Sequence, residues 1–362
     1  MNILYISHLS MIKSEGPNVS VPAQVGAQAK IDNVFWYNLT QAIQDHWLET
    51  GCFHGISEYP SKKIINLPPP FNAPDLVVFE SFYYIDDVKI ANWCKKKKIP
   101  YIVIPRSALT KKGQNQKKYK KIPANILLFK PMTRGAAAIQ YLTKAELDDS
   151  GMSWNKEAFV IPNGVYPAVE TKTWKKLGLH GVYIGRFDPY QKGLDLLIEA
   201  CEAIKTELLE AGVQIDLHGP ERLGWQERIR NEVKEKGLDE VIFVKDGVFG
   251  DAKKDVLLNA DFFLMTSRFE GHPMSMIEAL SYGLPVFATK GTNMTDEIIK
   301  YNAGWTCDNT VESIIDGLKK LIISKNELEE LSKNALSLSY NYNWERLAKK
   351  SHDEYIRIIR SC

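Results

Sequence analysis

The sequence has few cysteines and no long apolar run. Its five cysteines stand far apart, at Cys52, Cys94, Cys201, Cys307 and Cys362. An odd number without a close pair argues against a disulfide framework or a zinc site and is typical of a reducing compartment. The start, MNILYISHLS, lacks the basic segment and the length of a signal peptide. No stretch approaches the roughly 20 apolar residues of a spanning helix. We therefore expect a cytoplasmic protein.

Net charge is also small, because 46 Lys and Arg face 44 Asp and Glu. The balance is uneven: residues 1–165 carry 20 basic and 13 acidic side chains, and the remainder carries 26 and 31. The basic part includes a KKKK run from Lys95 to Lys98 and the segment KKGQNQKKYKK from Lys111 to Lys121. Such clusters either form solvated loops or attract an anionic membrane surface, at about 1 kcal/mol per basic residue. Only Tyr119 offers a stacking aromatic, so no nucleic acid partner is expected.

Short apolar runs alternate with longer segments, and this pattern occurs twice. Alternation of strands and helices predicts an α/β protein with two parallel-sheet, doubly wound domains. We expect a first domain over 1–165, a second over 166–345, and a C-terminal helix, 346–362, packing back towards the first. Helices are expected over segments that include 22–49 and 134–149. The expected strands are 2–7, 75–80, 101–105, 158–162, 181–186, 213–219, 241–245, 261–267 and 285–289.

The stretch RFEGHPMSMIEALSYGLPV, 268–286, carries two glutamates, Glu270 and Glu278, on either side of an expected helix start. With Pro273 at the first helical position, the N–H groups of Met274, Ser275 and Met276 are free to bind an anion such as phosphate. Glu278 is then placed to accept hydrogen bonds from a ribose diol. The alternative is an ordinary strand–loop–helix with two surface glutamates.

A second stretch, GRFDPYQKGLDLLIEA at 185–200, also leads from a strand into a helix. Arg186 and Lys192 flank its loop, and two cations at a strand end suit a diphosphate. Gly185 and Gly193 allow close backbone approach. The alternative is a pair of solvated basic residues on a turn.

Taken together, these stretches resemble glycosyltransferase family 4, the retaining glycosyltransferases with the GT-B fold. EGHPMSMIEALSYGLPV looks like the family's motif of two glutamates separated by seven residues, and GRFDPYQKGL looks like its Gly-Arg…Lys-Gly loop. IPNGV at 161–165, LHGPE at 217–221 and GWTCDNTVESI at 304–314 are similar to further family segments, in the expected order. The resemblance covers about 160–345.

The resemblance implies two Rossmann-like domains facing a central cleft, an N-terminal acceptor domain and a C-terminal donor domain. It implies that Arg186 and Lys192 stabilise the donor diphosphate as it leaves, with Glu270 as the third catalytic residue, and that Glu278 holds the ribose. The remaining donor-binding positions that it implies are Gly16, Gly185, Gly271, His272, Met274, Ser275, Val248 and Phe249.

The first half fits the family less closely. The usual glycine pair after the first strand is replaced by SEGPNVSVPAQV, 14–25, in which Gly16 and Asn18 are candidates for donor or acceptor contact and a surface turn is the alternative. Arg106 stands where many members have a histidine, and PRS resembles a Pro-Arg-Gly variant with Ser107 in place of glycine. Arginine is not a general base at neutral pH, so Arg106 is assigned to acceptor or phosphate binding. His8 is a further acceptor-side candidate.

The function implied is transfer of a sugar from a nucleotide-diphosphate donor to a hydroxyl acceptor, either lipid-linked or a growing surface polysaccharide. No Asp-x-Asp motif is present, so we expect no metal and no cofactor beyond the donor substrate. The enzyme would act in the cytoplasm or peripherally on the inner face of the membrane. Two alternatives stay open: a GT-B-fold nucleotide-sugar epimerase, and an inactive nucleotide-sugar-binding protein of a polysaccharide assembly complex. A dehydrogenase is not expected, because no G-x-G-x-x-G follows the first strand.

Overall fold

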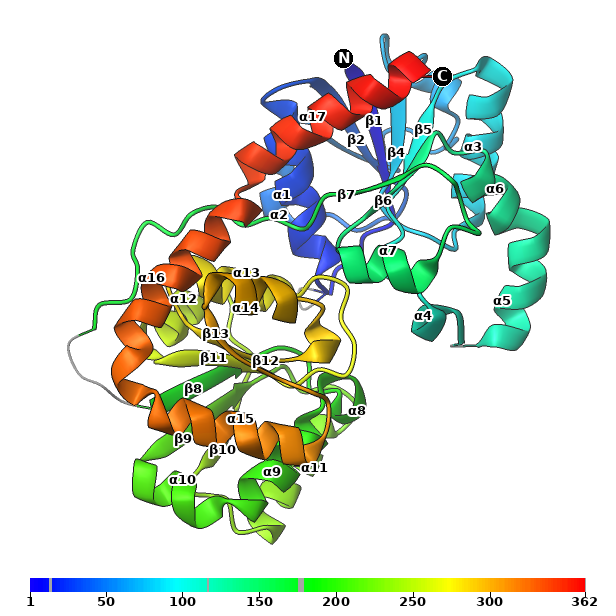
Figure 1. Cartoon of the computed structure of the whole chain (residues 1–362). Helices are drawn as coiled ribbons and strands as arrows, with labels where there is room; N and C mark the ends of the chain where they lie inside the picture. Colours follow the sequence, from blue (N-terminus) through cyan, green and yellow to red (C-terminus); the bar gives the residue numbers. More distant parts are fainter. Residues whose placement is uncertain (13–14, 116, 175–178, 362) are drawn as a thin grey trace. The chain divides into compact units, whose positions relative to one another are not determined.

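The computed structural model describes residues 1–12, 15–115, 117–174 and 179–361. The chain divides into two compact units. The first unit consists of Met1–Gly164 and Trp344–Cys362, and the second unit consists of Val165–Asn343. Each unit contains a parallel β-sheet with helices packed on both faces (Figure 1), which confirms the expected pair of doubly wound α/β domains.

The sheet of the first unit has the strand order β3-β2-β1-β4-β5-β6-β7. The side chains of β1 alternate between two layers of core: Ile3 and Tyr5 face one layer, whereas Leu4 and Ile6 face the other. The strands are β1 (Asn2–Ser7), β2 (Asn33–Asn38), β3 (Phe53–Gly55), β4 (Leu76–Phe79), β5 (Tyr101–Val103), β6 (Ala138–Tyr141) and β7 (Ala158–Val160).

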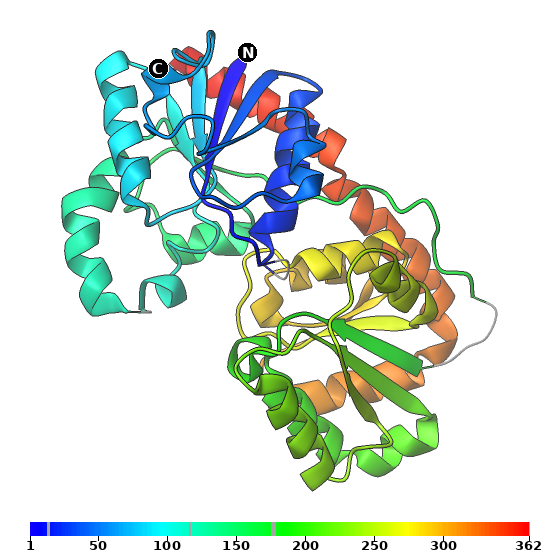
Figure 2. The same ribbon diagram turned by 180° about the vertical axis from the view of Figure 1, so that it is seen from behind.

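Helices cover both faces of this sheet (Figures 1 and 2). The C-terminal helix α17 (Trp344–Ser361) packs beside α1 (Pro17–Ala29) on the Ile3 and Tyr5 face, so it is part of the first unit. The opposite face is covered by α3 (Ile85–Lys97) and α6 (Lys130–Arg134). The other helical segments are α2 (Asp45–Leu48), α4 (Lys111–Asn115), α5 (Lys118–Ala124), the π-helical η2 (Asn125–Phe129) and α7 (Lys144–Ser150).

The sheet of the second unit has the order β10-β9-β8-β11-β12-β13. Its strands are β8 (Leu179–Ile184), β9 (Val213–His218), β10 (Ile242–Lys245), β11 (Phe262–Met265), β12 (Val286–Thr289) and β13 (Gly304–Cys307). Tyr183 of β8 packs towards α9 and α15, and its neighbours Val182 and Ile184 pack towards α13 and α16. The helices are α8 (Pro189–Lys192), α9 (Leu194–Ala203), α10 (Lys205–Ala211), α11 (Trp225–Glu235), α12 (Gly250–Asn259), α13 (Met274–Ser281), α14 (Thr295–Tyr301), α15 (Val311–Ile323) and α16 (Leu328–Ser339).

Two of the helices expected in the first unit, 22–49 and 134–149, are wrong. Residues 22–49 contain the end of α1, all of β2 and all of the short helix α2. Within β2, Trp36 and Tyr37 are both fully buried although they point to opposite faces, so this strand has no polar face to mark it. Residues 134–149 contain β6, which lies between β5 and β7. Ala136 and Ala137 before this strand and Ala138 within it favour a helix, and the pairing with two neighbouring strands overrides that preference.

Candidate functional site

The loop that leaves β8 is held against the end of β11. Asp188 caps α8 by accepting the Gln191 N–H at 2.8 Å, and Pro189 occupies the first helical position. Gly193 then adopts a left-handed conformation with φ of 63°. A Cβ at this position would lie 2.1 Å from the carbonyl oxygen of Thr266. Only glycine fits here, so the two loops are in direct contact.

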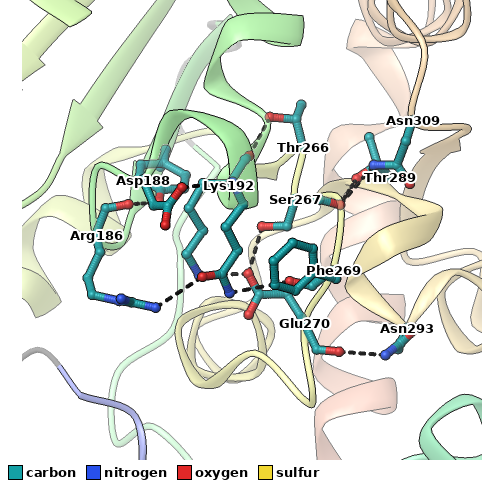
Figure 3. A network of polar contacts seen from close by, with 12 residues as sticks. Arg186, Asp188, Lys192, Thr266, Ser267, Phe269, Glu270, Thr289, Asn293 and Asn309 are labelled. Atoms are coloured by element: carbon teal, nitrogen blue, oxygen red, sulfur yellow. Dashed lines mark hydrogen bonds and ion pairs between the residues drawn. The ribbon is translucent and has the colours of Figure 1, made fainter. Parts of the chain in front are cut away.

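Lys192 and Glu270, both expected at the catalytic site, form an ion pair. Lys192 Nζ lies 2.6 Å from Glu270 Oε1, and the two side chains are only 10% and 11% exposed. Ser267 Oγ donates to the same carboxylate oxygen at 2.7 Å (Figure 3). Because these charges are largely removed from water, the attraction between them is stronger than that between two charges in water. An ammonium group has three N–H donors, so Lys192 can contact an anion while it is paired with Glu270.

Arg186 is linked through a glutamine to Phe269, the residue before Glu270. Its Nη2 donates to Gln191 Oε1 at 3.3 Å, and Gln191 Nε2 donates to the Phe269 carbonyl at 3.4 Å. The Arg186 carbonyl accepts the Tyr183 hydroxyl at 2.7 Å. Arg186, Lys192 and Glu270 therefore belong to one polar network built from the loops after β8 and β11 (Figure 3). Gln191 was not identified from the sequence, because an uncharged residue in a loop carries no distinctive signal.

Two asparagine side chains hold the backbone of the loop after β11 in place. Asn293 Nδ2 donates to the Glu270 carbonyl at 2.6 Å, and Asn309 Nδ2 donates to the Ser267 carbonyl at 2.8 Å. Both asparagines follow strands, β12 and β13, at the same edge of the sheet (Figure 3). Neither asparagine was predicted as a site residue, and their positions after these strands are the signal by which they can be found.

Helix α13 begins one residue later than expected. Pro273 is the N-cap rather than the first helical residue, and the Met276 N–H already donates to the Pro273 carbonyl at 3.2 Å. The expectation of three free N–H groups is therefore wrong for Met276. Met274 and Ser275 remain at the helix start, half-buried, after Gly271.

His272, on the loop before α13, is buried, and its ring lies 5.0 Å from that of Tyr342. Burial lowers the pKa of His272 to about 3.

Glu278 is paired elsewhere on the second unit. Its Oε2 accepts from Lys253 Nζ of α12, a contact that sequence analysis did not find. Val248 and Phe249 lie in the loop between β10 and α12, with Val248 packed on the core and Phe249 half-exposed. The loop passes close to its neighbour, because a Cβ at Gly247 would lie 2.9 Å from the Pro220 nitrogen.

Arg106, in the first unit, is saturated by protein acceptors. Its five N–H groups donate to the Glu80 carbonyl and carboxylate, Ser20 Oγ, Gln24 Oε1 and Asn163 Oδ1, at 2.6–3.3 Å. Glu80 is fully buried; burial raises the pKa of its carboxyl, and the Arg106 guanidinium opposes that shift. An acceptor or phosphate can bind Arg106 only if the side chain leaves one of these partners.

Ser107, which stands in place of the glycine of the Pro-Arg-Gly variant, has a backbone φ of 67°. This left-handed conformation favours glycine.

His8 lies at the end of β1 against Asp87. The distance from Nε2 to Asp87 Oδ1 is 2.7 Å, and the His8 ring stacks on Tyr84 with centroids 3.7 Å apart. The Asp87 side chain is buried, and burial raises the pKa of this carboxyl while His8 lowers it. The carboxylate thus holds His8 in one orientation.

Asn18 holds the loop between β1 and α1 together. Its Oδ1 accepts the Ser10 N–H at 3.2 Å, and its Nδ2 donates to the Ile12 carbonyl at 2.7 Å. Gly16 precedes α1, and a Cβ there would meet nothing within 4 Å, so no steric reason requires glycine. Ser14, in the same predicted segment, lies outside the described residues.

The structure therefore brings Arg186, Lys192 and Glu270 together and places Glu278 in a separate pair. Among the residues that the structure describes, no group of three or more His, Cys, Asp or Glu side chains is arranged to hold a metal ion. In the same described ranges, no helix has the length and apolar character needed to cross a bilayer.

The family model described as Glycosyl transferases group 1 matches residues 180–337, inside the second unit. The putative colanic acid biosynthesis glycosyltransferase WcaL of Salmonella typhimurium is 29% identical over 121 residues, which is 32% of this chain and 29% of that protein. A phosphatidylinositol N-acetylglucosaminyltransferase subunit of Homo sapiens is 27% identical over 210 residues, 55% of this chain and 41% of that protein. The matches thus span less than half the length of these curated relatives.

Solved structures match along the whole chain. Sucrose-phosphate synthase from Thermosynechococcus elongatus has a TM-score of 0.76 at 15% identity, with 100% of both chains covered. Anabaena Alr3699/HepE in complex with UDP has a TM-score of 0.77 at 14% identity, covering 98% of this chain and 99% of that one. Such distant likeness establishes the fold, which is that of the two-domain GT-B glycosyltransferases. Residues 180–337 of the second unit match the group 1 glycosyl transferase model, and the resemblance to glycosyltransferase family 4 is confirmed.

Proposed function

We propose that the protein is a retaining glycosyltransferase that moves a sugar from a nucleotide-diphosphate donor to a hydroxyl group. The observation that carries the proposal is the network of Arg186, Lys192 and Glu270. It lies within the part of the chain that matches the family model. It also lies beyond the carboxyl ends of β8 and β11, where open α/β sheets bind their ligands.

In this proposal the two cations act on the leaving group. Arg186 and Lys192 contact the diphosphate and stabilise its growing negative charge as the bond between sugar and phosphate breaks. The departing phosphate oxygen accepts the proton of the acceptor hydroxyl, whose oxygen forms the new glycosidic bond on the same face of the sugar. Glu270 holds Lys192 in position and faces the donor sugar. No metal is required, because the side-chain cations neutralise the diphosphate.

Glu278 is proposed to bind the ribose, and it would exchange its contact with Lys253 for the ribose hydroxyls. HepE was solved in complex with UDP and with UDP-glucose, so uridine nucleotides and their sugars are the first candidates to examine. The names of WcaL and of the human phosphatidylinositol glycosyltransferase support a surface polysaccharide or a lipid-linked acceptor. With such an acceptor, the enzyme would act in the cytoplasm at the inner face of the membrane.

The test is a screen of nucleoside diphosphates and their sugars by thermal shift and calorimetry, followed by NMR of the reaction. We expect one nucleotide to bind at the second unit and its sugar donor to give a product that keeps the donor's anomeric configuration, with or without EDTA. Tight nucleotide binding without any turnover would support the non-catalytic binding protein instead. An epimerised sugar would support the epimerase, and no nucleotide binding would refute the proposal.

A further inference from the structure

One segment of the first unit carries many basic side chains and no acidic ones. Residues 88–145 contain 15 Lys and Arg side chains and no Asp or Glu. The segment covers most of α3, all of α4, α5, η2 and α6, and the start of α7. A surface with charge of a single sign attracts a partner of the opposite sign.

The same segment carries an exposed apolar strip. Helices α5, η2 and α6 follow one another without a break from Lys118 to Arg134. One side of this rod packs on the core through Phe129 and Met132. The other side exposes a run of large apolar side chains, which we call the outer strip: Tyr119 (72% exposed), Ile122 (56%), Ile126 (64%) and Leu127 (73%).

An ordinary surface helix places polar residues on its outward side. The rod instead exposes isoleucine, leucine and tyrosine, and Leu128 on the same rod is 37% exposed. Elsewhere in the described residues, the exposed large apolar side chains occur singly or as two neighbours in sequence, such as Met11 with Ile12. The outer strip is therefore an unpartnered apolar surface of the kind that marks an interaction site.

Lysines border the outer strip at both ends. Lys117, Lys118 and Lys120 are exposed beside Tyr119. At the other end, Lys95 of α3 donates to the Pro131 carbonyl of α6 at 2.7 Å, which places the KKKK run next to the end of the rod (Figures 1 and 2). Lys121 turns inward, where its Nζ lies 4.8 Å from the ring of Tyr83.

We propose that the outer strip docks on an anionic lipid bilayer, with Ile126 and Leu127 entering the boundary between headgroups and acyl chains. Exposed apolar side chains flanked by lysines are the pattern of helices that lie in a membrane interface. The exposed apolar residues are mainly aliphatic, which fits acyl chains better than the stacked bases of a nucleic acid. A second copy of the chain would bring two basic surfaces together. This surface goes beyond the proposed function and does not depend on it.

The experiment measures binding of the full chain to vesicles of phosphatidylcholine alone and with phosphatidylglycerol. We expect binding only to the anionic vesicles. Lys117→Gln with Lys118→Gln should weaken it about 25-fold, since each lysine contributes about 1 kcal/mol, or fivefold. Ile126→Ser with Leu127→Ser should weaken it at least about tenfold through lost apolar burial. Leu127→Trp should show quenching by brominated lipid beyond that of the wild type.

Matched controls change equally exposed residues of the second unit. Ile299→Ser with Ile323→Ser, and separately Lys300→Gln with Lys333→Gln, should bind vesicles as the wild type does. The proposal is overturned if the variant Ile126→Ser, Leu127→Ser binds vesicles like these controls, or if neither kind of vesicle is bound. It is also overturned if ultracentrifugation shows that the outer strip mediates dimerisation. All outer-strip variants should bind nucleotide normally, so failure here is distinct from failure of the transferase proposal.

Discussion

Replacing Lys192 by methionine removes the charge from the centre of the proposed site and keeps the length of the side chain. Lys192 Nζ lies 2.6 Å from Glu270 Oε1 with both side chains about nine-tenths buried, so the change leaves a buried carboxylate without its cation. Breaking a fully buried pair costs about 3–5 kcal/mol. Ser267 still donates to Glu270, and we expect a loss of about 2–3 kcal/mol in the free energy of unfolding.

The loss of activity should be larger than this loss of stability can explain. Removing one donor that stabilises developing charge lowers kcat by about 100- to 1,000-fold. The double variant Lys192→Met, Glu270→Gln leaves no unpaired charge, so it should regain most of the stability. It should regain none of the activity, because the cation is still missing. Urea denaturation and turnover with the nucleotide sugar found in the screen measure the two effects separately.

The second unit contains a matched control. Lys172 Nζ lies 2.9 Å from Asp261 Oδ1 with side chains 8% and 7% exposed, and Asp261 precedes β11, at the opposite end of that strand from Glu270. Lys172→Met should therefore cost similar stability and leave turnover per folded enzyme within about threefold of the wild type. The reasoning fails if Lys192→Met keeps wild-type turnover, or if Lys172→Met loses as much activity as Lys192→Met.

Three further outcomes follow from particular contacts. Glu278→Gln should raise the Kd of the nucleotide at least about tenfold in calorimetry; an unchanged Kd would remove the ribose role. Gly193→Ala should cost more than about 2 kcal/mol in urea denaturation, since its Cβ would meet the Thr266 carbonyl, whereas Gly212→Ala has similar φ and open space and should cost about 1 kcal/mol. Equal costs would contradict the close approach of the two loops. Burial lowers the pKa of His272 from 6.5 to about 3. Below pH 6.5 the histidine therefore binds a proton in the unfolded chain but stays neutral in the folded protein. The free energy of unfolding is highest above pH 6.5 and falls as the pH falls towards 3. Between pH 7 and 5 the wild type should lose about 2 kcal/mol more than His272→Gln; equal slopes would count against a neutral buried histidine.

Five of the six strands of the second sheet were predictable because they are short, apolar and bounded by turn residues, whereas β13, Gly304–Cys307, was not among the expected strands. The run VQIDLHG, for example, contains β9, Val213–His218, and DFFLMTS contains β11. In the first sheet the same reasoning failed at β2, where Trp36 and Tyr37 are buried on opposite faces. Burial on both faces removes the period-two pattern, and only the pairing with β1, which is not local in sequence, identifies the strand.

The site was predictable in part. Arg186, Lys192, Glu270 and Glu278 carry charge at strand ends and match a known pattern, so they stand out in the sequence. The pairing of Lys192 with Glu270 joins residues 78 positions apart and could not be deduced from spacing. The saturation of Arg106 was equally hidden, because it depends on acceptors from distant segments such as Ser20 and Asn163.

The most direct test of the account is a crystal structure of the protein with the nucleoside diphosphate that binds it. The account predicts phosphate oxygens within hydrogen-bonding distance of Lys192 Nζ and the Arg186 guanidinium, and ribose hydroxyls on Glu278 in place of Lys253. A nucleotide bound elsewhere on the protein, with the contact between Lys192 and Glu270 undisturbed and no phosphate nearby, would contradict it.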